Sequence, residues 1–241
     1  MRKHRGLGAA LAAVVVTAAL SVVPARSYEE GAVSGGGSIE GKVVYKGAVP
    51  TRKIIPNKDV EVCGGIREEP LIHVGSDQAV ESAVVYLAEI AKGKAWPANS
   101  NPPELNNLKC RFVPEVQVIR GGPLVVVNSD PVLHNTHGHY GQRTAFNMAL
   151  PNQGQRIPTE LTRAGTVRVD CDAHGWMEAW IYVVDNPYYA ITSADGKFQI
   201  TDVPPGTYTL VAVQALTGPN QQTVSVAGGK PTNLTIELKK Q

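Results

Sequence analysis

Apolar residues alternate with polar ones, or form short runs, along most of the chain, and turn-forming residues separate these segments. Residues 39–45 read as a strand that Gly47 and Pro50 close, and residues 124–127 form a continuous apolar strand. Between Cys110 and the 180s the pattern predicts about seven short strands joined by turns, a spacing typical of a β sandwich or barrel. We therefore predict an all-β fold.

The last part of the chain continues in strands but changes its turn chemistry. Asp-Gly at 195–196 and Pro-Pro-Gly at 204–206 mark turns between apolar segments. About 50 residues are few for an independent β sandwich, so this part is small on its own. The predicted strands are residues 189–192, 196–200, 207–213, 222–226 and 232–238.

The stretches between these regions are less regular. Residues 79–92 fit either a helical face or a buried strand, and we favour the strand because β-branched residues sit together at 83–87. Residues 51–78 are predicted to be irregular, with a short strand at 71–74. Residues 93–107 contain three prolines and are predicted to be a loop or linker.

The N-terminus has the pattern of a secretory signal. Basic residues precede a long apolar run, and Ala25-Arg26-Ser27 presents small residues for cleavage. The alternative is an uncleaved single-span anchor, which the short, Ala-rich run disfavours. We therefore predict a signal peptide over 1–27, a flexible Gly-rich linker over 28–37, and a periplasmic or secreted protein with no stable membrane span after cleavage.

The charge of the whole chain is misleading. The formal net charge is +2, but residues 1–27 hold four basic residues and no acidic one, so the remainder carries −2. Neither value favours binding to nucleic acid, and we predict no nucleic-acid partner.

The chain has three cysteines, Cys63, Cys110 and Cys171. In an oxidising compartment two of them should pair, and the third needs a reason to stay free. Cys171 has that reason if it binds a metal, and Cys63 and Cys110 then form a disulfide. The alternative is that Cys63 or Cys110 pairs with Cys171, which would exclude a metal site there.

The segment 171–177, with the sequence CDAHGWM, is the strongest chemical signal. It places Cys171, His174 and Met177 at intervals of three residues after a predicted strand. A thiolate, two imidazoles and a weak axial thioether are the ligands of an electron-transfer copper site, and His134 at the start of another strand supplies the second imidazole. Each residue alone has a simpler explanation, since Met177 would more often be core and His134 a hydrogen-bonded strand end.

Two more histidines, His137 and His139, follow His134 with the spacing H-x₂-H-x-H. One interpretation is a second metal site, and the other is a solvated strand edge. We favour the strand edge. The aspartates Asp170 and Asp172 on either side of Cys171 are expected to face water.

Residues from about 112 to 184 resemble a cupredoxin of the plastocyanin/amicyanin type. The matching features are Phe112-x-Pro114, Gly121/Gly122 before an apolar strand, Asn128, His134-Asn135, Gly165 and Cys171-x₂-His174-x₂-Met177. The resemblance implies a Greek-key β sandwich with one type 1 copper ion bound by His134, Cys171, His174 and Met177. It also implies that Asn135 hydrogen-bonds across to the cysteine loop and that His174 is the ligand at the solvent edge. The chain departs from the pattern at Gly175, where many relatives have proline, and in lacking an obvious first strand.

Residues 187–240 resemble a carboxypeptidase regulatory-like (transthyretin-like) module, through 192–198 and Val203-Pro204-Pro205-Gly206-Thr207. Such modules begin with two strands that this region lacks, and candidates lie far upstream at 41–43 and 84–87. We therefore expect a smaller, discontinuous transthyretin-like sandwich into which the copper unit is inserted. The expected divisions are 38–104 for an N-terminal β segment of that sandwich, 105–186 for the cupredoxin domain and 187–241 for the regulatory-like module.

The function that these signals favour is an exported type 1 (blue) copper protein that carries one electron and is not an enzyme, because the chain lacks the repeated His-x-His sets of multicopper oxidases. It would serve an unidentified redox partner protein, with Trp176 on the docking surface. One alternative is a copper-binding or delivery protein in which His137 and His139 exchange the ion. The other is a surface β module without metal that has a structural or interaction role.

Overall fold

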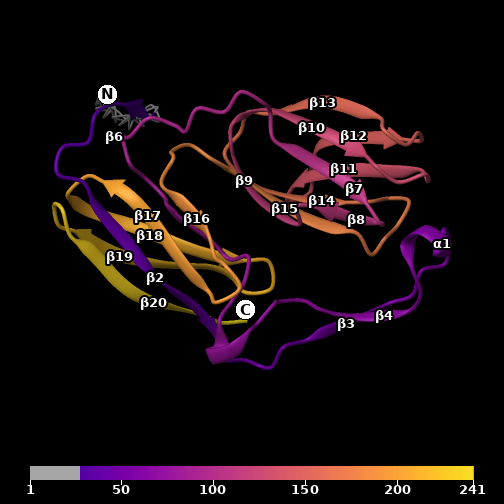
Figure 1. The fold of residues 1–241 in the computed structure, drawn as a ribbon, viewed down its shortest axis with the longest axis horizontal. Helices are drawn as coiled ribbons and strands as arrows, with labels where there is room; N and C mark the ends of the chain where they lie inside the picture. The colour runs from indigo at the N-terminus through magenta and orange to yellow at the C-terminus, as the bar shows by residue number, and fades with distance from the viewer. Residues whose placement is uncertain (1–27, 241) are drawn as a thin grey trace, which may run out of the picture.

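The computed structural model describes residues 28–240 and consists almost entirely of strands, which confirms the all-β prediction (Figure 1). The predicted signal peptide, residues 1–27, lies outside the described residues. Within residues 28–240 no helix is long and apolar enough to cross a membrane. Four larger sheets form two sandwiches that lie side by side, and each has a buried apolar core of its own.

The first sandwich packs a four-stranded sheet on a five-stranded sheet. Side chains alternate between buried and exposed along most of these strands, as a sheet with one face on the core requires. The four-stranded sheet has the order β13 (Arg156–Leu161), β10 (Gly122–Asn128), β7 (Glu104–Leu108) and β8 (Arg111–Val113). The five-stranded sheet has the order β12 (Arg143–Leu150), β11 (His134–Tyr140), β14 (Gly165–Asp170), β15 (Glu178–Val184) and β9 (Val116–Arg120).

Strand β7 corrects the prediction of a loop over 93–107. It pairs in parallel with β10. It supplies the first strand, which could not be recognised when the sequence was matched to the family pattern. Its sequence is polar, but Leu105 and Asn107 are fully buried. The Asn107 side-chain amide donates to the carbonyl oxygen of Val127 at 2.8 Å and to Thr136 Oγ1 at 3.1 Å. A buried asparagine satisfied by two long-range partners produces no apolar pattern, so the strand could not be recognised from its own residues.

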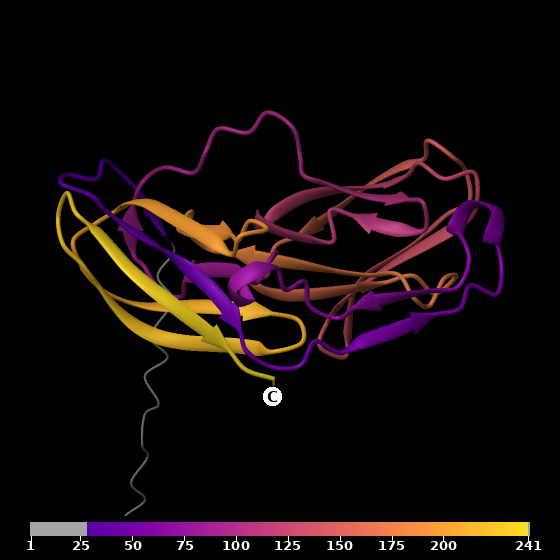
Figure 2. The same cartoon turned by 60° about the horizontal axis from the view of Figure 1, so that its bottom comes forward.

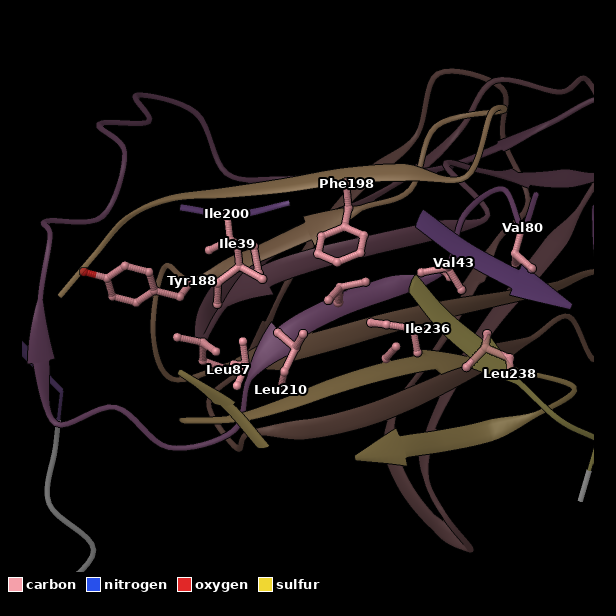
Figure 3. Packing of buried hydrophobic residues seen from close by; sticks show 14 of the residues in the cluster. Ile39, Val43, Val80, Leu87, Tyr188, Phe198, Ile200, Leu210, Ile236 and Leu238 are labelled. Atoms are coloured by element: carbon pink, nitrogen blue, oxygen red, sulfur yellow. The ribbon is translucent and has the colours of Figure 1, made fainter. Parts of the chain in front are cut away.

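The second sandwich is built from both ends of the described chain. One sheet has the order β16 (Tyr189–Ile191), β5 (Val84–Leu87), β18 (Gly206–Gln214) and β19 (Gly218–Val226). The other has the order β17 (Lys197–Val203), β2 (Gly37–Tyr45) and β20 (Pro231–Leu238). If the N-terminal and C-terminal strands formed separate cores, Val43 and Leu210 would lie in different clusters. Both belong to one buried cluster (Figure 3). The C-terminal strands therefore obtain the missing strands from residues 37–45 and 84–87.

The two sandwiches are joined where the chain leaves β5 and where it returns in β16. These two strands are antiparallel neighbours, with Tyr86 opposite Tyr189, so the first sandwich is an insertion between adjacent strands of the second (Figure 1). The segment expected to end at 104 takes in Glu104, the first residue of β7 in the first sandwich. Within the linker expected over 28–37, β1 (Glu29–Glu30) pairs with β6 (Lys92–Gly93), and Gly37 begins β2.

Residues 46–78 form a long excursion between β2 and β5, which we call the strap. It contains β3 (Thr51–Ile54), α1 (Val60–Cys63), β4 (Arg67–Pro70) and the 3₁₀ turn η1 (Ser76–Gln78). The strands β3 and β4 pair with each other and run along the first sandwich, with α1 at the far end (Figures 1 and 2). The short strand expected at 71–74 is absent, and only a single bridge joins Val74 to Val80.

A disulfide between Cys63 and Cys110 fixes α1 to the first sandwich and leaves Cys171 as a free, buried thiol. This is the pairing that the metal hypothesis requires. Because Cys63 and Cys110 are 47 residues apart in sequence, the bond closes a long loop and restricts the unfolded chain.

Thr192, between β16 and β17, offers a test of the second sandwich. Its buried hydroxyl accepts from the Ala83 N–H at 2.9 Å and donates to the Val80 carbonyl at 2.6 Å. Thr192→Val is isosteric but removes both bonds, so we expect the free energy of unfolding to fall by about 1–3 kcal/mol. Urea denaturation of the variant measures the loss, with Thr235→Val on the exposed side of β20 as the matched control. Equal stability of the two variants would contradict this role for Thr192.

Candidate metal centre

The four predicted ligands come from two places at one pole of the first sandwich. His134 is the first residue of β11, and the other three lie on the loop that joins β14 to β15. This loop consists of two successive tight turns, in which the His174 N–H donates to the Cys171 carbonyl at 3.2 Å and the Met177 N–H donates to the His174 carbonyl at 2.9 Å. The two turns explain the three-residue ligand spacing, because each one returns the chain to the same pole.

Three of these side chains converge on one point. His134 Nδ1 and His174 Nδ1 are 3.1 Å apart, and Cys171 Sγ lies 3.8 and 3.7 Å from them. A point equidistant from atoms with these separations lies about 2.1 Å from each, which is close to the bond length of a metal to imidazole nitrogen and slightly shorter than that to thiolate sulfur. His134 and His174 have no exposed surface and Cys171 is 1% exposed, so the convergence occurs in a closed, water-poor space.

The outer nitrogens of both imidazoles face carboxylates. His134 Nε2 lies 2.8 Å from Asp130 Oδ2, and His174 Nε2 lies 3.0 Å from Asp59 Oδ2. A carboxylate only accepts, so each Nε2 carries the proton and each Nδ1 presents a lone pair. Two lone pairs and a sulfur atom therefore point at the same place, and a cation bound between them removes their mutual repulsion.

Asp130 is itself a buried carboxylate, and the chain around it is shaped to hold it. Its oxygens accept from the backbone N–H groups of Lys109 at 2.7 Å and Cys110 at 2.8 Å. Lys109 and Cys110 both have φ of 52°, so the turn between β7 and β8 directs two consecutive N–H groups at one carboxylate. The orientation of His134 thus depends on residues that precede it by more than 20 positions.

Burial also sets the protonation of the inner groups. It raises the pKa of the Cys171 thiol, against the lowering effect of the Asn135 N–H, which donates to Sγ with an N···S distance of 3.4 Å. It lowers the pKa of the His134 imidazole, partly offset by Asp130. A neutral imidazole is ready to bind a metal, whereas the buried thiol needs a nearby positive charge to become a thiolate. The donor set of two imidazoles, one cysteine and a methionine on the same loop fits copper.

Comparisons with known proteins found a family model and similar solved structures. Residues 164–239 match the model of the carboxypeptidase regulatory-like domain. The solved structures to which the chain is similar include two cupredoxins. Amicyanin from Paracoccus versutus is 16% identical over 36% of this chain and 86% of its own, with a TM-score of 0.32. The purple cupredoxin from Nitrosopumilus maritimus is 21% identical over 34% of this chain and 99% of its own, with a TM-score of 0.31.

A copper-containing nitrite reductase from Thermus scotoductus is also similar, with 22% identity over 39% of this chain and 25% of its own and a TM-score of 0.32. No curated protein matches the chain. The family match begins next to β14, which belongs to the first sandwich, and continues to β20, the last strand of the second. The matched range therefore crosses from one sandwich into the other, and it includes the loop with Cys171.

The structure specifies the contact of Asn135. Asn135 was expected to hydrogen-bond to the cysteine loop. Its side-chain amide donates to Asn147 Oδ1 at 2.7 Å, and its Oδ1 has no hydrogen-bond partner among residues 28–240. The contact with the loop is made instead by the backbone N–H, which donates to Cys171 Sγ. Asn135 thus acts on the sulfur through its main chain, because its side chain points along the outer face of the sheet.

His174 differs most from expectation. It was predicted to be the ligand at the solvent edge, yet its imidazole is fully buried. Asp59 of the strap covers its Nε2 edge, and the Trp176 ring lies with its centroid 5.1 Å away. Sequence reasoning missed Asp59 because it sits 115 residues before His174 in a stretch predicted to be irregular. The one available signal was the disulfide, since Cys63 lies four residues after Asp59.

Met177 is a core residue, and the additional histidines lie outside the converging group. Met177 is 3% exposed and packs in the core of the first sandwich, after the two turns that carry Cys171 and His174. His137 and His139 lie on the outer face of β11 with ring centroids 3.9 Å apart. Their nearest carboxylates are 3.3 and 3.8 Å away, but among the described residues they join no group of three converging metal-ligating side chains.

Proposed function

We propose that the protein is an extracytoplasmic type 1 copper protein that carries one electron at a time. The observation that carries the proposal is the convergence of His134 Nδ1, His174 Nδ1 and Cys171 Sγ, with separations between 3.1 and 3.8 Å, in a buried pocket. Bound copper would supply a one-electron couple. These three groups would hold the ion as its strong ligands, and Met177 would be a fourth, weak ligand.

The protein's own contribution is to hold these groups still. His134 is fixed by its strand and by Asp130, and Cys171 and His174 are fixed by the two turns of their loop. A site whose ligands cannot move changes little when the charge of the ion changes, which favours rapid electron exchange. The proposal is of a carrier rather than an enzyme, and its redox partner is expected to be another protein.

An extracytoplasmic location is part of the same proposal. The Cys63–Cys110 disulfide is typical of proteins that fold in an oxidising compartment, and the signal pattern over 1–27 agrees with export. Copper delivery is the alternative use of the same ligands. It is less favoured, because a fully buried His174 under the strap suits retention of an ion better than its release.

Copper titration tests the proposal. Adding Cu²⁺ to the protein with its free thiol reduced is expected to produce an intense visible band from thiolate-to-copper charge transfer, and voltammetry is expected to show a reversible one-electron wave. Cys171→Ser should abolish the band, since the thiolate is its source. Ala173→Ser, on the same loop, should keep it. A colourless wild-type protein that binds no copper would leave only a structural or interaction role.

A further inference from the structure

The copper ligand His174 is covered by a segment that belongs to neither sheet of its sandwich. Asp59, in the strap, places Oδ2 3.0 Å from His174 Nε2, while the Asp59 side chain remains 35% exposed on its other side. The carboxylate therefore stands between the imidazole and solvent. In the first sandwich the equivalent partner of His134 is Asp130, which comes from the sandwich itself. The two histidines are thus oriented by carboxylates of different origin.

The position of Asp59 is set by the disulfide. The Asp59 carbonyl accepts from the N–H groups of Val62 at 3.0 Å and Cys63 at 2.8 Å, so one helical turn connects the carboxylate to the Cys63–Cys110 bond. Asp59 itself has φ of 51°, a left-handed conformation that aspartate tolerates better than most residues do. Moving the disulfide would therefore move the carboxylate away from His174.

Ion pairs also attach the strap to the first sandwich. Glu69 of β4 forms ion pairs with Arg52 and Arg67 of the strap and with Arg111 of β8. A cavity of about 230 Å³ remains between these side chains and the loop that carries Trp176 and Met177. Ile54, Cys63 and Ile72 of the strap are buried, and at the end near the metal centre the strap is attached by the Cys63–Cys110 bond and by these ion pairs.

We propose that the strap is a cap over the metal centre and that Asp59 is a positioning residue for His174. This inference rests on the proposed function for its effect on copper. Asp59 holds the imidazole with Nδ1 toward the ion and excludes solvent, small ligands and partner proteins from the Nε2 edge. Its negative charge stabilises Cu²⁺ relative to Cu⁺, so the cap also lowers the reduction potential of the centre. Electrons then reach the ion by a route other than the Nε2 edge of this histidine.

The cap can be tested without copper by chemical modification of imidazoles. In the metal-free full-length protein, diethyl pyrocarbonate is expected to modify the exposed His73 while His174 stays protected, and peptide mass spectrometry reads both sites. Asp59→Ala and the double variant Cys63→Ser/Cys110→Ser should each increase modification of His174 at least about tenfold relative to His73. If His174 in the wild type reacts as quickly as His73, the cap is open and the inference fails, whatever the protein does with copper.

The effect on the ion is tested with a matched pair of charge removals in the strap. Asp59→Asn keeps an oxygen that can accept from His174 but removes the charge, so the blue band should remain and the reduction potential should rise. Glu61→Gln, on the exposed side of α1, removes the same charge without touching the histidine and should leave the potential nearly unchanged. Equal shifts of the reduction potential in the two variants would mean that Asp59 acts only as a surface charge at a distance, which would contradict its positioning role.

Asp59→Ala completes the test. It should lower copper affinity by about 10–100-fold, as loss of a carboxylate behind a ligating imidazole typically does, and it should let added imidazole change the visible spectrum. Unchanged affinity and spectrum would contradict the inference. A wild-type protein that protects His174 but forms no thiolate-to-copper band would refute the copper function while supporting the cap, so the two failures are distinguishable.

Discussion

A chain that begins at Lys46 is expected not to fold its second sandwich, although all the C-terminal strands of that sandwich are present. Such a chain lacks β2, the central strand between β17 and β20, and with it the buried side chains of Ile39 and Val43. Strands β17 and β20 would each lose their only neighbour in that sheet. Hydrogen exchange measures the result, and the amides of 206–226 should change from protected to rapidly exchanging.

The matched control is a chain that begins at Gly36, which loses β1 but keeps β2. It should retain protection in 206–226, because β1 contributes only two residue pairs to a separate small sheet. If the chain that begins at Lys46 remained protected there, the second sandwich would fold without its distant N-terminal strand β2.

Among substitutions outside the four proposed ligands, Asp130→Ala is expected to have the largest effect near the metal centre. It removes the partner of His134 Nε2 and leaves the N–H groups of Lys109 and Cys110 without an acceptor in a buried environment. Buried donors without partners cost about 1–3 kcal/mol each, so the free energy of unfolding of the metal-free protein should fall by roughly 2–5 kcal/mol. Copper affinity should fall as well, by about 10–100-fold.

Urea denaturation and competition with a copper chelator measure these two losses separately. Asp172→Ala is the control, because Asp172 lies beside Cys171 in sequence but its side chain is 54% exposed and contacts only His137. The control should change stability and affinity little. Equal losses in both variants would mean that Asp130 acts through general charge and not through the groups it holds.

The sequence predicted those features that depend on local spacing. Alternating apolar residues identify the strands of both sandwiches, and the tight turns of 171–177 bring residues three apart to one pole, so Cys171 and His174 could be paired from their spacing. His134 could be added because it opens a strand. The upstream partners of the C-terminal strands were found because the size of that region required them.

Features that depend on distant contacts could not be predicted in the same way. Strand β7 is held by Asn107 and by its pairing with β10, and neither contact leaves an apolar pattern in residues 104–108. Burial of His174 depends on Asp59 in the strap, whose position follows from a disulfide and one helical turn. An irregular segment has no periodicity from which its docking site can be inferred, so the exposed edge that the resemblance implied for His174 was wrong for this chain.

The parallel pairing of β2 with β20 has a mechanical consequence. The two strands lie near opposite ends of the described chain and share eight consecutive residue pairs, from Ser38 with Pro231 to Tyr45 with Leu238. Because they run in the same direction, a force that pulls the chain ends apart acts along the strands and stretches all their hydrogen bonds together, whereas an antiparallel hairpin would open one bond at a time. Tension applied at the two ends would therefore act on the β2–β20 pair before it acted on the metal centre.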